Sequence, residues 1–490
     1  MANGLEWRVV FPNGSSQELV PQSGWGRRVW MGAWGLILGL KLRLLGLVEK
    51  IWKLGVDDPR RVVHGLKVGI SLTLVSLFYY MRPLYDGVGG TAMWAVMTVV
   101  VVFEFTVGAT LSKGLNRGMA TLLAGSLAIG IHWIANQLGD QADPIIRSTA
   151  VFLLASVATF SRFIPIVKTR FDYGVSIFIL TFSLVSVSGY RVEELVVFAR
   201  HRLYTIAIGG SVCMLISMLI CPNWAGGDLH QLITRNMEKL ACSLERCVSE
   251  YFEDSECLDP KEEPCQGFQG YKCVLNSKAT EETLANFARW EPAHGCFSFR
   301  HPWKQYIKIG TVMRHCAYCV EALEASINSD NKAPEFIKKH FREVFMRLSS
   351  HSSNVLRELA AATKTMRKSS NLDLLVEEMK MAVGELQSSL RYFPHQLIPP
   401  PIEATEDKRA PAHAPPTHVP FMEVLPLVTA ASLLIEIVVR IEGLVDAVDE
   451  LAGLANFKPA IDDKPKQSMV TNNPPQELQG QEAMKVLQQV

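Results

Sequence analysis

The chain has 490 residues, 48% of them hydrophobic, and its 49 Lys and Arg almost balance its 48 Asp and Glu, leaving a formal net charge of +1. This balance gives no indication of a nucleic-acid-binding protein. The length allows a membrane domain and one substantial soluble domain. Phosphate-binding glycine loops, HExxH pairs and Ser/His/Asp arrangements do not stand out, so we do not expect an enzyme.

The first helix expected along the chain covers residues 30–52. It is apolar on one face and carries Lys41, Arg43, Lys50 and Lys53. This pattern is typical of a helix lying on the inner leaflet, with Trp at the level of the lipid headgroups. We place this interfacial helix in an N-terminal cytoplasmic segment, residues 1–55. A seventh transmembrane span is the alternative, and Lys41 and Arg43 oppose it because charge is costly in mid-membrane.

Six strongly apolar stretches follow, each close to the roughly 20 residues that a helix needs to cross a bilayer. Lipid cannot satisfy backbone polar groups, so each span must be helical. The expected spans, within a pore domain over residues 56–222, are 62–81, 91–111, 118–138, 145–167, 173–190 and 203–221.

Lys and Arg residues between the spans predict the orientation, because they are enriched on the cytoplasmic side. Basic residues precede the first span and occupy the second and fourth loops, where Lys113, Arg117 and Lys168 lie. Both termini are therefore expected in the cytoplasm. The fifth loop breaks this rule on the outer side, with Arg191, Arg200 and Arg202.

The second half of the chain has the pattern of amphipathic soluble helices. We expect a cytoplasmic helical bundle over residues 223–457, with a proline-rich linker at about 398–419 and a disordered tail over 458–490. Residues 425–454 are apolar enough to imitate a span, but Glu436 and Arg440 near their centre favour a core-facing helix. The predicted fold class is all-α, a polytopic membrane protein with six spans and this bundle.

Charged residues at membrane depth are the first functional candidates, because they are expensive there. Glu104 is expected to face the bundle interior and pair with a cation such as Lys67 or Arg117; a proton relay is the alternative. Arg117 opens the third expected span on the inner side and Arg202 opens the sixth on the outer side. Facing one pathway, they would attract anions at each mouth. Lipid anchoring is the alternative for these arginines and for Lys67.

Several motifs resemble the plant aluminium-activated malate transporter family. They are DPRRVVH at 58–64, WAVMTVVVVFEF at 94–105, GATLSKGLNR at 108–117, FDYG at 171–174, WAG at 224–226 and WEPAHG at 290–295. The resemblance runs from about residue 56 to at least 457. It implies a homodimeric channel, with six spans per subunit and a cytoplasmic helical domain, that passes malate and other anions passively. A proton-coupled anion carrier is the alternative.

The same resemblance assigns roles to single residues. Arg117 and Arg202 match the family's pore-lining cations, and Lys113 and Lys67 complete our candidate anion-binding set. The family's outward acidic residues, implicated in activation by external aluminium, correspond to Asp86 and Glu193.

A third acidic position of the family is Val197 here, and Glu194 is the substitute that we expect. No cofactor other than Al³⁺ as an activator is implied. Similarity to root-type members favours the plasma membrane, with the vacuolar membrane as the alternative.

Overall fold

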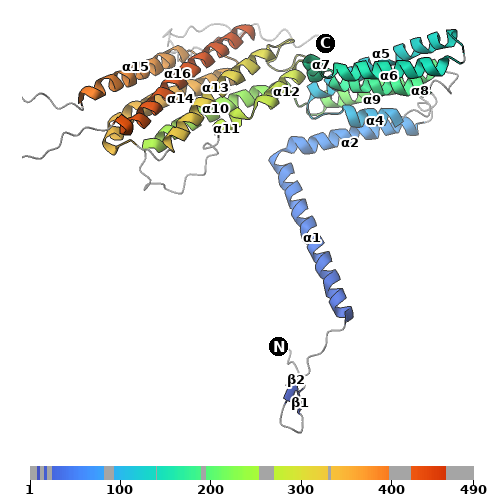
Figure 1. Cartoon of the computed structure of the whole chain (residues 1–490), viewed down its shortest axis with the longest axis horizontal. Coiled ribbons are helices and arrows are strands. Elements are labelled where there is room, and N and C mark those ends of the chain that lie inside the picture. Colours follow the sequence, from blue (N-terminus) through green and yellow to red (C-terminus); the bar gives the residue numbers. More distant parts are fainter. Residues whose placement is uncertain are drawn as a thin grey trace, which may run out of the picture. The chain divides into compact units, whose positions relative to one another are not determined.

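The computed structural model describes residues 8–10, 16–18, 25–81, 93–139, 141–188, 195–252, 270–328, 333–396 and 421–459. These residues are almost entirely helical (Figure 1). They form two compact units: residues 1–233 with 276–311, and residues 234–275 with 312–490. The Pro-rich linker at 398–419 and nearly all of the tail expected over 458–490 lie outside the described residues.

The first unit begins with a short antiparallel hairpin of β1, Arg8–Val10, and β2, Ser16–Glu18. Helix α1 then covers Trp25–Asp57 and α2 covers Pro59–Tyr80. Asp58, between the two helices, accepts a hydrogen bond from the backbone N–H of Arg60 at 3.3 Å. Proline at the first helical position and an acidic cap before it both favour a helix start, which explains the sharp division.

The second expected span is wrong in its extent. Helix α4 covers Met93–Val102, and α5 begins at Val107 and continues to Gln137. Thr106 caps α5, because its hydroxyl accepts the N–H of Ala109 at 3.3 Å. The backbone N–H of Val107 donates to the carbonyl of Asn223 at 2.9 Å, so a distant segment also supports the break.

The loop expected at 112–117 is likewise wrong, because these residues lie inside α5. The remaining membrane-type helices are α6, Asp143–Ser161; the short α7, Pro165–Arg170; α8, Asp172–Ser188; and α9, Leu195–Leu219. The fifth expected span matches α8 closely, whereas the fourth divides into α6 and α7. Pro165 begins α7, and Arg162 lies in the turn before it.

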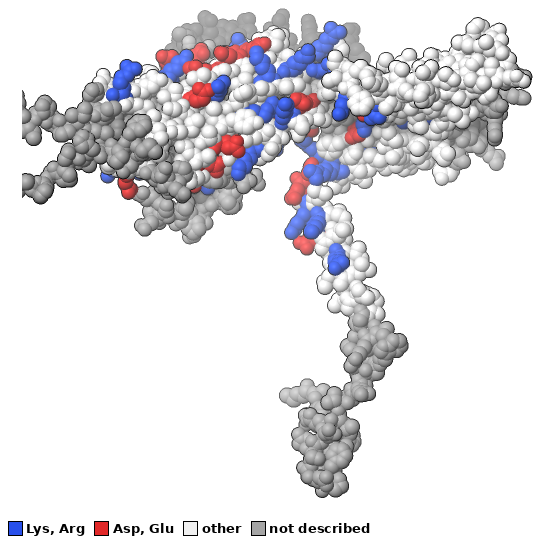
Figure 2. Space-filling view, in the orientation of Figure 1, with Lys and Arg blue, Asp and Glu red and all other residues white. Residues whose placement is uncertain are grey.

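These helices pack through two apolar clusters. One joins α2, α4 and α9 through residues such as Val75, Val99 and Cys213. The other joins α5 and α8 through Ala128 and Phe182, with α6 packed against it. On the face seen in Figure 2, the surface over α4, α5, α6 and α8 is nearly free of charge. An apolar outer surface of this kind suits lipid.

Among the described residues, four helices are long and apolar enough to cross a membrane: α5, α6, residues 199–219 of α9 and residues 424–454 of α16. Helices α4 and α8 are apolar but shorter. The six-span count therefore stays a prediction.

The first unit also contains α12, Lys278–Ala288, and the starts of α10, Ala225–Phe252, and α13, Trp303–Ile327. The second unit contains the rest of α10 and α13 together with α11, Gly270–Leu275; α14, Glu335–Thr365; α15, Leu372–Gln396; and α16, Phe421–Leu454. Helix α16 contacts both α14 and α15, and Leu434, Ile441 and Leu451 on it are buried. Helices α14, α15 and α16 therefore pack together, whereas the domain expected over residues 223–457 and the side of the membrane on which it lies stay predictions.

Candidate functional site

Two arginines of the predicted set are buried inside the first unit. Arg117 lies well inside α5 and is 4% exposed, and Arg202 lies in α9 and is 2% exposed. Within the described part of the chain, neither guanidinium forms an ion pair with a carboxylate. A buried cation without a counter-charge is unfavourable, because burial removes its hydration and nothing replaces it.

Aromatic side chains hold both guanidinium groups. The Arg202 guanidinium lies 4.0 Å from the centre of the Trp94 ring, a cation–π contact. Nη1 of Arg117 donates to the Tyr173 hydroxyl at 3.2 Å. Nε of Arg117 and both Nε and Nη1 of Arg202 have no acceptor among the described residues. The two arginines therefore keep unused hydrogen-bond donors inside the unit.

The expectation that each of these arginines opens a span is wrong, whereas their place along an anion pathway stays a prediction. Arg117 and Arg202 lie close enough for their charges to repel one another. The prediction started the third span at residue 118 and the sixth at 203, whereas α5 starts at Val107 and α9 at Leu195. Both arginines therefore lie inside helices rather than at their ends.

Glu104 lies in the break between α4 and α5 and forms an ion pair with Lys113. The expected partners, Lys67 and Arg117, are therefore wrong. The Lys113 ammonium also lies 5.6 Å from the centre of the Tyr173 ring. Both charged side chains of the pair are about one-third exposed, so solvent screens their attraction. Lys113 therefore contacts Tyr173, the same aromatic residue whose hydroxyl accepts a hydrogen bond from Arg117.

Lys67 has a different environment from the other cations. It is 1% exposed, and its ammonium donates to the carbonyl of Cys221 at 2.8 Å, just beyond the end of α9. Unsatisfied carbonyl groups at a helix C-terminus favour a cation. Lys67 therefore ties α2 to the end of α9.

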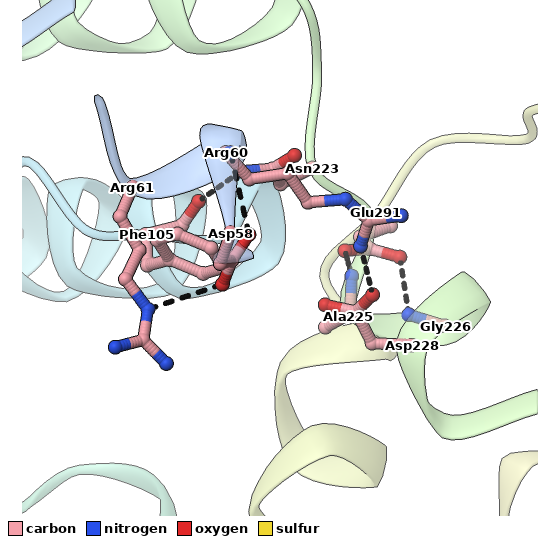
Figure 3. A network of polar contacts seen from close by, with 9 residues as sticks. All are labelled: Asp58, Arg60, Arg61, Phe105, Asn223, Ala225, Gly226, Asp228 and Glu291. Carbon is pink, nitrogen blue, oxygen red and sulfur yellow. Dashed lines mark hydrogen bonds and ion pairs between the residues drawn. The ribbon is translucent and has the colours of Figure 1, made fainter. Parts of the chain in front are cut away.

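Sequence reasoning missed Glu291, which binds the first turns of two helices (Figure 3). Its carboxylate accepts N–H bonds from Gly108 in α5 at 3.3 Å and from Ala225 and Gly226 in α10 at 2.6 and 3.0 Å. Helix N-termini attract negative charge through their unpaired N–H groups. Burial raises the pKa of Glu291, and these hydrogen bonds act in the opposite direction.

The network around Glu291 includes the corner between α1 and α2. Arg60 of α2 forms an ion pair with Asp228 of α10 at 3.0 Å, and Arg61 pairs with Asp58 at 3.1 Å (Figure 3). Asn223 donates to the carbonyl of Phe105 at 3.4 Å. The starts of α2, α5 and α10 are therefore held together by polar contacts. The only sequence signal was the WEP triplet at 290–292, which reveals no partner.

The acidic residues expected to bind aluminium, Asp86, Glu193 and Glu194, lie outside the described residues. Arg191 of the fifth expected loop also lies outside them. The described residues contain no group of three or more His, Cys, Asp or Glu side chains arranged to hold a metal ion.

Comparison with known proteins identifies the family. The profile described as "Aluminium activated malate transporter" matches residues 52–408 and 394–452. Aluminum-activated malate transporter 10 of Arabidopsis thaliana is 52% identical over 474 residues, covering 93% of this chain and 95% of the relative.

Aluminum-activated malate transporter 2 of the same plant is 47% identical, covering 84% of this chain and 78% of the relative. Aluminum-activated malate transporter 1 of Triticum aestivum is 43% identical, covering 88% and 90%. The resemblance in the motifs is thereby confirmed, and the chain is an integral membrane protein that belongs to the aluminium-activated malate transporter family.

Proposed function

We propose that this protein is an anion channel that passes malate and other small organic and inorganic anions passively across a plant membrane. The observation that carries the proposal is the pair of buried guanidinium groups, Arg117 and Arg202, which keep unused N–H donors and have no carboxylate partner among the described residues. Such groups attract an anion that replaces the missing counter-charge. The relatives are named malate transporters, and malate is a dicarboxylate anion that suits guanidinium groups.

The guanidinium group suits a carboxylate because its planar fork donates two hydrogen bonds at once. Conduction also requires that the anion leave again. In a hydrated pathway with an effective dielectric constant of about 20, two charges about 4 Å apart attract by about 4 kcal/mol, against about 20 kcal/mol in a dry interior. Aromatic contacts of Trp94 and Tyr173 occupy part of each cation and moderate the attraction further.

The two arginines provide the direct test. We expect Arg117→Gln and Arg202→Gln each to lower malate current in voltage-clamped cells at least about tenfold, the effect of losing 1.4 kcal/mol of attraction. Arg200→Gln is the matched control, because Arg200 is exposed and lies two residues from Arg202 on the same helix. Undiminished malate current in the Arg117 and Arg202 variants, with normal surface delivery, would reject the proposal.

A proton-coupled carrier with Glu104 as its relay is the rival mechanism. The ion pair with Lys113 gives Glu104 a structural partner, so a relay is not needed to explain a carboxylate at this position. As a channel, the protein should show currents that reverse at the anion equilibrium potential at every external pH. Glu104→Gln should retain anion current, since it removes a negative charge and leaves Lys113 unpaired. A reversal potential that follows pH, and loses this dependence in Glu104→Gln, would favour the carrier.

The proposal includes the assembly and regulation that the family resemblance implies. Two subunits would line a pore along the dimer axis, in the plasma membrane, with both termini in the cytoplasm. The carboxylates of Asp86, Glu193 and Glu194 would supply hard oxygen ligands to external aluminium. Whole-cell recording with malate inside, before and after external aluminium, tests this part. An unchanged current would remove aluminium activation and leave the anion channel itself untouched.

A further inference from the structure

Helix α1 carries an apolar stripe that no described residue covers. Its residues recur at intervals of three and four, the spacing of one helix face. The stripe consists of Ile37, Leu40, Leu44, Leu47, Ile51 and Leu54, whose side chains are 49% to 62% exposed. A stripe of this length needs a partner, because exposed aliphatic surface in water is unfavourable.

The charged residues of α1 are arranged around that stripe. Lys41 borders one edge, and Arg43 and Lys50 border the other, since residues two apart on a helix point to nearly opposite sides. Glu49 and Lys53, which form an exposed ion pair at 3.1 Å, lie on the opposite side of α1, together with the exposed side chains of Leu38, Leu42 and Leu45. Lys and Arg at both boundaries of an apolar face can bury the aliphatic part of the side chain in lipid and keep the charged group among the headgroups.

A second copy of α1 is a weaker match for this surface. In a coiled coil, the positions that flank the apolar seam usually carry opposite charges that pair between helices. Here the charged flanking residues Lys41, Arg43 and Lys50 are all basic, so they offer no such pairs. A transmembrane position fits poorly as well, because Lys41 and Arg43 would point to opposite sides at the same depth.

We propose that α1 lies in the plane of a membrane surface and binds anionic lipid headgroups, with its apolar stripe in the acyl region and Lys41, Arg43 and Lys50 on lipid phosphates. This adds lipid charge selectivity to the interfacial position expected from the sequence. It does not depend on anion conduction, so the two proposals fail separately. Each basic residue near an anionic surface is expected to strengthen binding about fivefold.

Hydrogen–deuterium exchange of the full-length protein in lipid nanodiscs tests the inference. The substitutions Leu44→Glu and Leu42→Glu introduce the same charge on opposite sides of α1, and only Leu44 belongs to the stripe. We expect peptides of α1 to exchange at least about tenfold faster in Leu44→Glu than in the unaltered protein, whereas Leu42→Glu should change little.

Lipid selectivity is tested by comparing phosphatidylcholine nanodiscs with nanodiscs that contain about 30% phosphatidylglycerol. Anionic lipid should slow the exchange of α1 about fivefold or more, and K41Q/R43Q/K50Q should abolish this difference. K304Q/K339Q/R342Q is the matched control, because it removes the same charge from exposed positions on α13 and α14 and should keep the difference.

Three results would overturn the proposal. Equal acceleration by both glutamate substitutions would indicate a transmembrane position. Fast exchange of α1 in every variant and both lipids would indicate a helix free in water. Protection that is independent of lipid charge, together with a cross-link between residues 44 of two subunits identified by mass spectrometry, would indicate a second copy as the partner.

Discussion

Trp94 and Tyr173 hold the two buried arginines, Arg202 and Arg117, by different kinds of contact. The Arg202 guanidinium lies 4.0 Å from the centre of the Trp94 ring in a cation–π contact, whereas Arg117 is held by one hydrogen bond to Tyr173. A cation–π contact at a desolvated site contributes about 2 kcal/mol, which competes with the attraction of an anion. In the proposed channel, the Trp94 ring would therefore limit how strongly Arg202 attracts an anion.

Replacing that ring gives a prediction at the scale of one residue. We expect Trp94→Leu to free Arg202 and to lower the malate concentration for half-maximal current about tenfold, while Trp94→Phe should give a smaller change. Malate concentration series under voltage clamp measure the effect. An unchanged half-maximal concentration in Trp94→Leu would show that the ring does not compete with the anion.

His301 is a second residue whose environment has a measurable consequence. It is buried among the rings of Phe297, Trp303 and Tyr306, and its Nε2 lies 3.3 Å from the Tyr306 hydroxyl. Burial lowers the pKa of His301 to about 4 from its ordinary value near 6.5. The folded protein therefore keeps this imidazole neutral under conditions in which the unfolded chain would protonate it.

The sign of the pH effect follows from this difference. Because the unfolded state binds the proton first, the free energy of unfolding should fall as pH drops from about 6.5 to about 4, by about 3 kcal/mol from this group. The thermal unfolding midpoint of the protein in detergent, measured from pH 8 to pH 4.5, reports the change. His301→Phe should flatten the dependence and His315→Phe, at an exposed position, should not. Equal pH dependence in all three proteins would contradict the prediction.

At the scale of helices, the start of α5 depends on close contact with the last turn of α12 and with Glu291 just after it. A methyl group on Gly108 would overlap the carbonyl of Phe287 and approach the side chain of Glu291. Gly118, also in α5, has open space at the same position. The close packing at Gly108 therefore requires glycine, whereas the described residues leave room for a side chain at Gly118.

This contrast predicts different effects of the same substitution. Gly108→Ala should lower the free energy of unfolding by about 1–3 kcal/mol, because backbone must move to admit the methyl group. Gly118→Ala should be neutral or stabilise by up to about 1 kcal/mol, because alanine is the better helix former. The thermal unfolding midpoints of both variants and of the unaltered protein in detergent measure these effects. Equal destabilisation by the two substitutions would contradict the prediction and would mean that Gly118 also has a close neighbour, such as a second subunit.

Helix boundaries show how far the sequence alone could predict this fold. Hydropathy located the apolar helices, and the fifth expected span agrees closely with α8. The break before Val107 was missed because no Gly or Pro marks it; it depends on the Thr106 cap and on the carbonyl of Asn223, far along the chain. The polar run 112–117 looked like a loop because it carries Lys113 and Arg117; within the helix, Lys113 pairs with Glu104 and Arg117 donates to Tyr173.

In the candidate site, too, the sequence predicts some residues, whereas others depend on contacts between distant segments. Arg117 and Arg202 were predictable because charge stands out in apolar surroundings. Glu291 was not predictable, since its three partners are backbone N–H groups of residues 108, 225 and 226, which carry no side-chain signal. Proximity of Arg117 and Arg202 was missed as well, because it requires the true starts of α5 and α9.

At the scale of the whole molecule, α16 decides how many times the chain crosses the membrane. It is apolar enough to span, yet it packs against α14 and α15, and Glu442 lies 3.9 Å from Lys380 of α15. Glu436 and Arg440 form a further ion pair near its centre. Charged side chains that pair between neighbouring helices fit an aqueous surface better than lipid, because lipid offers no hydration.

We therefore expect α16 to stay out of the membrane and the C-terminus to lie on the same side as the N-terminus. Epitope tags placed at either end of the full chain should both remain unlabelled by antibody in intact cells and become labelled after permeabilisation. A tag inserted in the segment between α2 and α4 serves as the outward-facing control. If the C-terminal tag alone were labelled in intact cells, the chain would cross the membrane an odd number of times, and α16 would be the span that the six-helix topology omits.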